Sequence, residues 1–162
     1  MDNNYVLITG ASSGIGYELA KLFKRDGYNL ILVARDKEKL QMAVDKLNNE
    51  KNKIIMLDVD LSREDEVDKL IKYINKNEID INILVNNAGI GSFGEFAEID
   101  WKTEEKLIDI NIKALTKLTK YFLPKMIEKK SGGILNVAST AAFASGPRMA
   151  TYYASKAYVL NL

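Results

Sequence analysis

The 162-residue sequence predicts an α/β protein with a doubly wound parallel sheet. Short apolar runs alternate with stretches of helical periodicity, which is typical of alternating strands and helices. The runs are apolar at nearly every position, which indicates a sheet covered on both faces. A glycine-rich turn joins the first run directly to the first helix, as at the ligand-binding edge of such sheets.

The first two strand-helix units extend to the polar stretch NNEKNK (48–53). The runs YVLIT (5–9) and NLILVA (29–34) have the length of buried strands. A helix is expected from about Gly14 until Asp26-Gly27, because apolar residues recur there at helical spacing. The expected inward residues of the two helices are Ile15, Leu19, Leu22 and Phe23, then Leu40, Val44 and Leu47.

Two further strands follow, IIMLDV (54–59) and INILVN (81–86), with a third helix between them. Ser62 and Asp65 resemble a capping pair at the start of this helix. Its apolar face is expected to contact the sheet through Val67, Leu70, Ile71 and Ile74.

The rest of the chain predicts a long helix from about Thr103 to Lys129, a strand GGILNVAS (132–139) and a helix beginning near Thr151. No internal repeat or linker interrupts residues 1–162, so we expect one domain. Right-handed crossovers favour the strand order 3-2-1-4-5. Ligand is then expected at the carboxyl ends of the strands, near the switch between strands 1 and 4.

Composition and charge exclude several function classes. The 23 basic and 22 acidic residues alternate along the helices, so a nucleic acid partner is not expected. No apolar run approaches the ~18 to 20 residues of a membrane span, and the amino-terminal residues lack a basic region, so the cytoplasm is predicted. Without Cys or His, no thiolate, imidazole base or usual metal site is expected, and a general acid must be Tyr, Lys, Asp or Glu.

The turn TGASSGIG (9–16) is the first candidate for a binding site. Glycine lets the backbone turn sharply, and the following helix start offers N–H groups to a pyrophosphate. A tight turn without a ligand is the alternative interpretation. The candidate binding residues are Gly10, Ser12, Ser13, Gly14, Ile15 and Gly16.

The GxxxGxG spacing of this turn resembles the signature of the short-chain dehydrogenase/reductase family. The resemblance continues along essentially the whole chain, in Asp58, the segment Asn86-Asn87-Ala88-Gly89, Asn111, Ser139, and Tyr152 with Lys156. It implies a Rossmann-like NAD(P)-binding domain over residues 1–162 and an oxidoreductase activity on small carbonyl or alcohol substrates.

A cofactor preference is suggested by Arg35, which ends the second strand. A guanidinium can pair with the 2′-phosphate of NADP(H), so NADP(H) is favoured over NAD(H). A surface arginine is the alternative, and Asp36 beside it is compatible with NAD.

Other cofactor contacts follow from the resemblance alone. It implies that Asp58 and Val59 hold the adenine and that Asn87, Ala88 and Gly89 line the ribose, although Asp58 also reads as a polar strand end. Two consecutive asparagines after a buried strand require hydrogen-bond partners in any case.

The proton donor must be chosen between two tyrosines. Tyr152 and Tyr153 precede Lys156 by four and three residues, so both can share its helix face. A tyrosine hydroxyl becomes a useful acid when a nearby ammonium lowers its pKa from about 10. The family pattern places a serine thirteen residues before its YxxxK tyrosine, and by that resemblance Ser139 selects Tyr152.

The resemblance implies a Ser-Tyr-Lys-Asn catalytic set. Ser139 would polarise the substrate oxygen and Tyr152 would exchange its proton, while Lys156 would assist Tyr152 and hold the nicotinamide ribose. Asn111 would anchor a water of a proton relay. Arg148 and Met149 are either substrate contacts or parts of an exposed loop, and Phe93, Phe96 and Trp101 are interpreted as core or loop packing.

Family members are usually longer than this chain, and two further strands, a sixth and a seventh, are missing from it. We therefore expect residues 1–162 to be the amino-terminal part of a longer reductase that forms a homodimer or homotetramer. The predicted reaction is hydride transfer between NADP(H) and a ketone or secondary alcohol, which includes 3-oxoacyl substrates. A catalytically silent dinucleotide-binding or assembly module is the alternative function.

Overall fold

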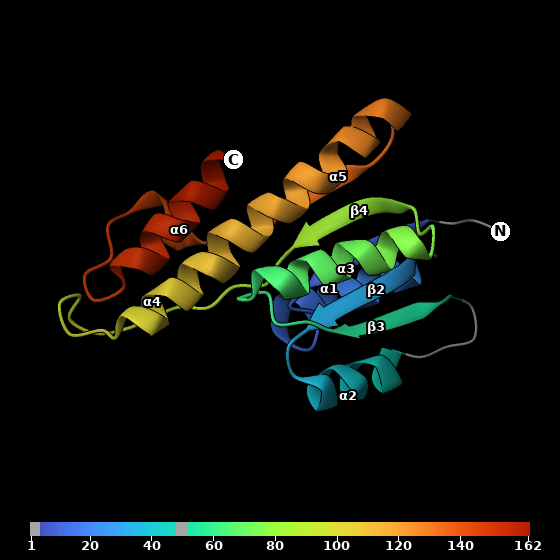
Figure 1. The fold of residues 1–162 in the computed structure, drawn as a ribbon. Coiled ribbons are helices and arrows are strands. Elements are labelled where there is room, and N and C mark those ends of the chain that lie inside the picture. Colours follow the sequence, from blue (N-terminus) through green and yellow to red (C-terminus); the bar gives the residue numbers. More distant parts are fainter. Residues whose placement is uncertain (1–3, 48–51) are drawn as a thin grey trace.

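The computed structural model describes residues 4–47 and 52–162. In these residues the strands form one parallel sheet in the order β3-β2-β1-β4-β5 (Figure 1), so the predicted fold class and topology are confirmed. The strands are β1 (Tyr5–Thr9), β2 (Asn29–Ala34), β3 (Ile54–Asp58), β4 (Ile81–Asn86) and β5 (Gly133–Asn136).

Helices cover both faces of the sheet (Figure 1). The helices α1 (Gly14–Arg25) and α2 (Lys37–Leu47) pack on one face, and α3 (Glu64–Lys76) packs on the other. Side chains of β1 alternate between the two layers: Val6 and Ile8 pack with α1 and α2, whereas Leu7 packs with α3. The apolar run is continuous because both of its alternating faces are buried.

The predicted long helix is formed, but it is not uniform. It consists of α4 (Trp101–Ile108), a π-helical segment η1 (Asp109–Ala114) and α5 (Leu115–Lys129). It begins two residues earlier than expected because the Asp100 carboxylate accepts a hydrogen bond from the Lys102 N–H at 3.1 Å. π-Helical turns are frequent at functional sites, and this one contains Asn111.

Two sequence predictions about element ends are wrong. The strand β5 ends at Asn136, and Ser139 instead caps a short 3₁₀ helix η2 (Thr140–Phe143) that precedes α6 (Ala150–Asn161). Ser62 and Asp65 do not cap α3, because the Ser62 hydroxyl bonds Asp60 at 2.7 Å while Asp65 pairs with Lys69 at 3.1 Å. The expected end of the second helix falls partly on 48–51, outside the described residues.

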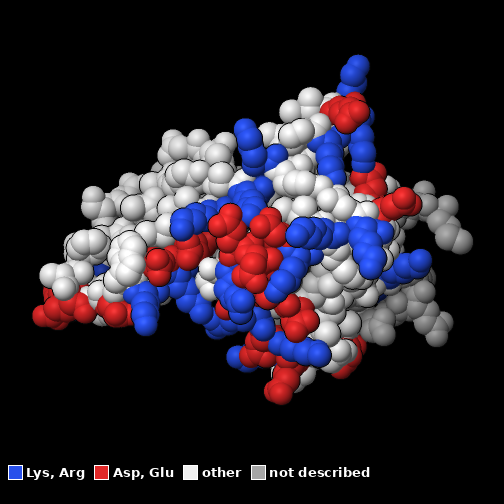
Figure 2. Space-filling view, viewed as in Figure 1, with Lys and Arg blue, Asp and Glu red and all other residues white. Residues whose placement is uncertain are grey.

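Charges on the visible surface are mixed. Figure 2 shows Lys and Arg intermingled with Asp and Glu over the face that carries α3, and mostly uncharged atoms over α6. Within residues 4–47 and 52–162, no helix is both long enough and apolar enough to span a membrane.

Candidate active site

The glycine turn after β1 is shaped by its close approach to the loop after β4. Gly10 has a positive φ of 67°, which favours glycine. A Cβ on Gly16 would clash with the Gly10 carbonyl oxygen and the Asn87 side chain. The start of α1 can therefore lie against the turn only because residue 16 has no side chain.

Thr9 and Asn87 hold this arrangement with reciprocal hydrogen bonds. The Thr9 hydroxyl donates to the Val85 carbonyl at 3.2 Å and accepts from the N–H groups of Asn87 and Ala88, each at 3.0 Å. The Asn87 amide donates back to the carbonyls of Thr9 at 2.9 Å and Gly10 at 3.1 Å. The turn after β1 and the loop after β4 are thus held in one fixed geometry.

The amide nitrogen of Asn86 has the partners that were expected, whereas its buried Oδ1 has none among the described residues. Its buried amide donates to Thr119 of α5 and to Asn136 of β5, each at 2.9 Å. This side chain therefore ties together two strands and the helix that covers them.

A cavity of about 470 Å³ lies at the carboxyl ends of β1, β2 and β4, where ligand was expected. Its lining includes most of the predicted cofactor residues, namely Gly10, Ser12, Ser13, Ile15, Arg35, Val59, Asn87, Ala88 and Gly89. Gly14 and Gly16 shape the turn without lining the cavity. Asp58 is exposed at the end of β3 and does not line it either, so its adenine contact stays a prediction.

Two cavity residues, Lys39 and Asp60, were missed by sequence reasoning. Lys39 follows Arg35 by four residues, a spacing that would have revealed it once the helix start was known. Burial acts to raise the pKa of Asp60, but hydrogen bonds from Ser62 and the charges of Lys106 and Arg35 outweigh it and lower the pKa. Asp60 is therefore ionised at neutral pH.

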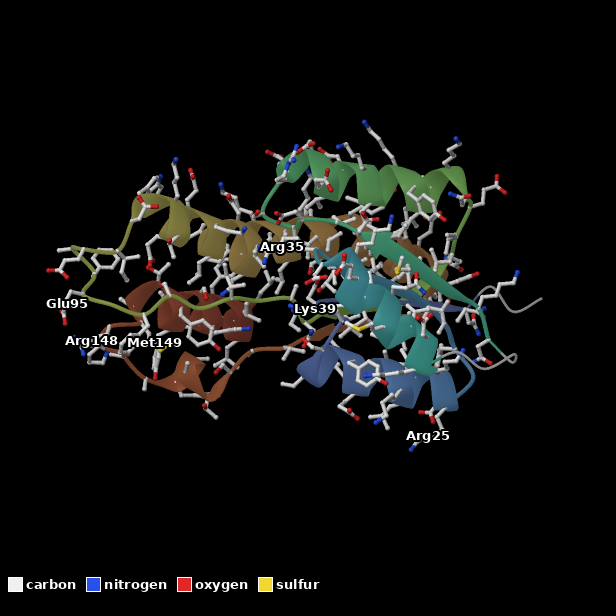
Figure 3. All side chains as sticks on the ribbon, turned by 90° about the horizontal axis from the view of Figure 1, so that it is seen from below. Arg25, Arg35, Lys39, Glu95, Arg148 and Met149 are labelled. Atoms are coloured by element: carbon white, nitrogen blue, oxygen red, sulfur yellow. The ribbon has the colours of Figure 1, made fainter. Side chains whose placement is uncertain are left out.

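Two basic side chains, Arg35 and Lys39, lie at the end of β2 together with Asp36, whose carboxylate is paired with Lys39. Asp36 accepts from the Lys39 N–H at 3.0 Å and pairs with its Nζ at 3.2 Å, and these contacts lower the pKa of Asp36. Arg35 is exposed and forms no ion pair with a described residue. Figure 3 shows Arg35 and Lys39 in the middle of the molecule, where α2 meets the sheet.

Asn111 connects the loop after β4 to α6. Its side chain is 1% exposed, accepts from the Ile90 N–H and donates to the Ile90 carbonyl, both at 2.9 Å. It also donates to Ser155 Oγ at 2.9 Å, which in turn donates to the Tyr152 carbonyl at 2.7 Å. A single buried amide thereby positions the helix turn that carries Tyr152.

Lys156 is buried beside Tyr152. Its Nζ donates to the Val137 carbonyl at 2.9 Å and lies 5.9 Å from the centroid of the Tyr152 ring. Burial lowers the pKa of Lys156. A Cβ on Gly89 would lie 3.4 Å from Lys156 Nζ and 3.3 Å from Asn111 Oδ1, so the lysine and the asparagine meet at a cavity residue.

The two remaining candidates occupy different places. Ser139 lies at the start of η2, which packs on α6, and its Oγ accepts from the Ala141 N–H at 3.1 Å. Tyr153 packs its ring so closely on Gly146 that a Cβ there would clash with it. Tyr153 thus contacts the loop before α6, whereas the Tyr152 ring lies near Lys156. The described residues contain no group of acidic side chains able to hold a metal ion.

Comparison with known proteins gives concordant matches. The sequence profile of the short chain dehydrogenase family matches residues 4–162. A short chain dehydrogenase of Pseudocercospora fijiensis is 36% identical over 159 residues, which cover 94% of this chain and 50% of that protein.

Two solved structures share the fold. A short-chain dehydrogenase of Sphingobium yanoikuyae in complex with NADPH is 38% identical with a TM-score of 0.90, covering 98% of this chain and 62% of the other. The bulky-bulky ketone specific alcohol dehydrogenase of Comamonas testosteroni is 34% identical with a TM-score of 0.90, covering 97% and 63%. The chain thus spans between half and two thirds of the length of these proteins.

Proposed function

The chain belongs to the short chain dehydrogenase family, and from that premise we propose that it catalyses hydride transfer between NADP(H) and a ketone or secondary alcohol, 3-oxoacyl compounds included. The observation that carries the proposal is the buried Lys156 ammonium beside the Tyr152 ring. Asn111 lies next to this ammonium, because both side chains approach Gly89. Burying an ammonium with a single hydrogen bond is costly for a fold and is a common feature of catalytic sites.

Each member of the set has a chemical task in carbonyl reduction. The cofactor, when bound, supplies the hydride to the carbonyl carbon. Ser139 Oγ already accepts from the Ala141 N–H, so its own hydrogen is left to donate to the carbonyl oxygen. Tyr152 gives its hydroxyl proton to that oxygen, and the Lys156 ammonium stabilises the phenolate that remains. The lowered pKa of Lys156 also makes it a ready source of the proton that restores Tyr152.

Several features of the cavity support our proposal of a dinucleotide that carries a 2′-phosphate. The first turn of α1 has no acidic side chain, so its N–H groups can receive a pyrophosphate. Arg35, which has no ion-pair partner among the described residues, supplies a positive charge at the end of β2, where the phosphate of NADP(H) would lie, and Lys39 lies beside it. Asp36, which would repel that phosphate, is engaged by Lys39. The NADPH complex of the Sphingobium relative supports the same preference.

Replacing Tyr152 with phenylalanine tests the catalytic assignment. Tyr152→Phe should lower kcat for ketone reduction about 10³-fold, because the proton donor is lost, while NADPH binding is retained. Tyr153→Phe is the matched control and should keep most of the activity. If the natural protein binds NADPH but reduces no ketone, the silent binding module is the correct function.

Replacing Arg35 tests the cofactor assignment. Arg35→Ser should raise the Kd for NADPH at least about tenfold, since a charge-assisted hydrogen bond contributes roughly 1.5 to 3 kcal/mol, and should leave the Kd for NADH unchanged. Arg25→Ser, which removes an arginine remote from the cavity (Figure 3), is the control. Equal weakening of the binding of both cofactors would contradict a role of Arg35 in phosphate recognition.

Cytoplasmic location and assembly as a homodimer or homotetramer stay predictions.

A further inference from the structure

Residues 90–100, between β4 and α4, form a loop beside the candidate proton donor; we name it the entrance loop. A Cβ on its Gly91 would lie 3.5 Å from the Tyr152 ring and 3.4 Å from the Met149 methyl group. The backbone of the entrance loop is therefore a wall next to Tyr152. Any displacement of this wall changes the space available to a substrate.

The two ends of the entrance loop are anchored by different groups from its middle. Ile90 is bonded on both sides by Asn111, and Asp100 caps α4. Between them, the hydrogen bonds, ion pair and ring contact that join 93–95 to described residues outside the entrance loop all go to Arg148. The Gly94 N–H donates to the Arg148 carbonyl at 2.9 Å, Arg148 Nε donates to Glu95 Oε1 at 2.8 Å, and the guanidinium carbon lies 5.5 Å from the Phe93 ring centroid.

The backbone of Arg148 is unusual in a way that fits this contact. Its φ is +66°, a left-handed conformation that is uncommon outside glycine. The other two described non-glycine residues with positive φ lie just after helices, where this conformation is ordinary: Lys130 directly follows α5, and Glu78 lies two residues after the end of α3. Arg148 instead precedes a helix, α6, and its carbonyl accepts a hydrogen bond from the Gly94 N–H of the entrance loop. Such conformations persist where surrounding contacts hold them.

Folding stability does not account for this contact. The side chains of Arg148 and Glu95 are 55% and 60% exposed, and exposed ion pairs contribute little to folding. The location of the contact is more informative. Met149, the residue after Arg148, contacts the entrance loop at Gly91, which also contacts the Tyr152 ring. Figure 3 shows Glu95, Arg148 and Met149 together at one end of the molecule, far from Arg35 and Lys39.

We propose that Arg148 is a positioning residue that clasps the middle of the entrance loop to the segment before α6 and so sets how large a group beside the carbonyl can be seated at Tyr152. The proposal rests on the proposed function in taking Tyr152 as the proton donor. It assigns substrate size selection to a charge pair outside the reacting groups. Phe93 of the entrance loop is 71% exposed, and its ring lies against the Arg148 guanidinium.

A charge swap in the natural protein tests the clasp. Arg148→Glu and Glu95→Arg each place like charges together and should lower kcat/KM for acetophenone about tenfold, with acetone changed less than about twofold, because only the larger ketone reaches the loop. The double variant restores the opposite charges and should return kcat/KM for acetophenone to within about threefold of the wild type. Arg25→Glu, an exposed reversal next to Asp26 on α1, is the matched control and should change neither ketone.

Hydrogen exchange of the entrance-loop peptide gives a readout that does not depend on turnover. Exchange should quicken about tenfold in each single variant, return in the double variant and stay unchanged in Arg25→Glu. The proposal is overturned if the double variant fails to restore exchange, or if both ketones lose kcat/KM equally, which would place the effect at Tyr152. If the wild type reduces neither ketone, the proposed function fails, and exchange alone decides whether Arg148 holds the loop.

Discussion

The part of the sheet around β1 and β2, which we call the nucleotide side, and the part around β5, which we call the catalytic side, hold their functional residues by different means. Every residue of β1, and all of β2 after Asn29, is buried between apolar layers. No residue of β5 is buried to that extent, and Leu135 is 40% exposed. The β5 side is held instead by polar contacts, from Asn86 to Asn136 and from Lys156 to the Val137 carbonyl.

Because of this difference, we expect the two sides to be sensitive to different kinds of substitution. The nucleotide side is fixed by close packing, so added volume should damage it most. The catalytic side is fixed by a few buried polar groups, so the loss of a hydrogen-bonding atom or a change of protonation should damage it most. Three substitutions, two of them paired with a control variant, test this contrast.

Added volume at Gly16 should have the largest effect. Gly16→Ala forces a methyl group against the Gly10 carbonyl and the Asn87 side chain, and we expect a loss of about 3 kcal/mol of unfolding free energy. That corresponds to a Tm lower by about 10 °C, with NADPH binding lost as well. Thermal unfolding followed by circular dichroism measures it.

Gly133→Ala is the control on the catalytic side. A Cβ at Gly133 in β5 meets no atom within 4 Å, so the Tm should change by less than about 2 °C. Equal losses in the two alanine variants would remove the proposed contrast in packing.

Loss of the buried amide at Asn111 should have the second largest effect. Asn111→Ala leaves the Ile90 N–H and carbonyl without their partner, and a buried unsatisfied group costs about 1 to 3 kcal/mol. Urea unfolding should show a decrease near 2 kcal/mol, together with a fall in kcat. Asn77→Ala, which removes an exposed amide bonded to the Tyr73 carbonyl, should cost less than about 0.5 kcal/mol. A similar cost at both sites would argue against a special role for buried polar groups.

The pH dependence contributed by Lys156 should be the smallest effect. Burial lowers its pKa below the ordinary 10.5, so between the folded and unfolded pKa values the unfolded chain binds more protons. The free energy of unfolding therefore rises with pH across that interval. Lys156→Met lacks this contribution, so wild-type stability relative to the variant should increase in urea titrations as the pH rises toward 10.5. A constant difference would show that burial does not perturb Lys156.

Sequence reasoning succeeded where local pattern carries the information. Apolar runs such as YVLIT and NLILVA predicted the strands because both faces of each are buried. The positions of Gly10 and Gly16 predicted a turn that only residues without side chains can form. Predictions of where elements begin and end were less accurate. The Ser62 hydroxyl bonds the Asp60 carboxylate instead of a helix N–H, and β5 ends before Ser139.

Sequence reasoning alone predicted the order of strands, the glycine turn and the spacing of Ser139, Tyr152 and Lys156 along the chain. Helical spacing left Tyr152 and Tyr153 equivalent, and the resemblance to a family separated them. The packing of Tyr153 on Gly146, the hydrogen bonds of Asn111 to Ile90 and the contacts of Arg148 with the entrance loop became visible in the folded molecule. The physical reason is that periodicity reports which face of an element is buried, whereas these contacts join loops distant in sequence whose partners are set by how the elements pack.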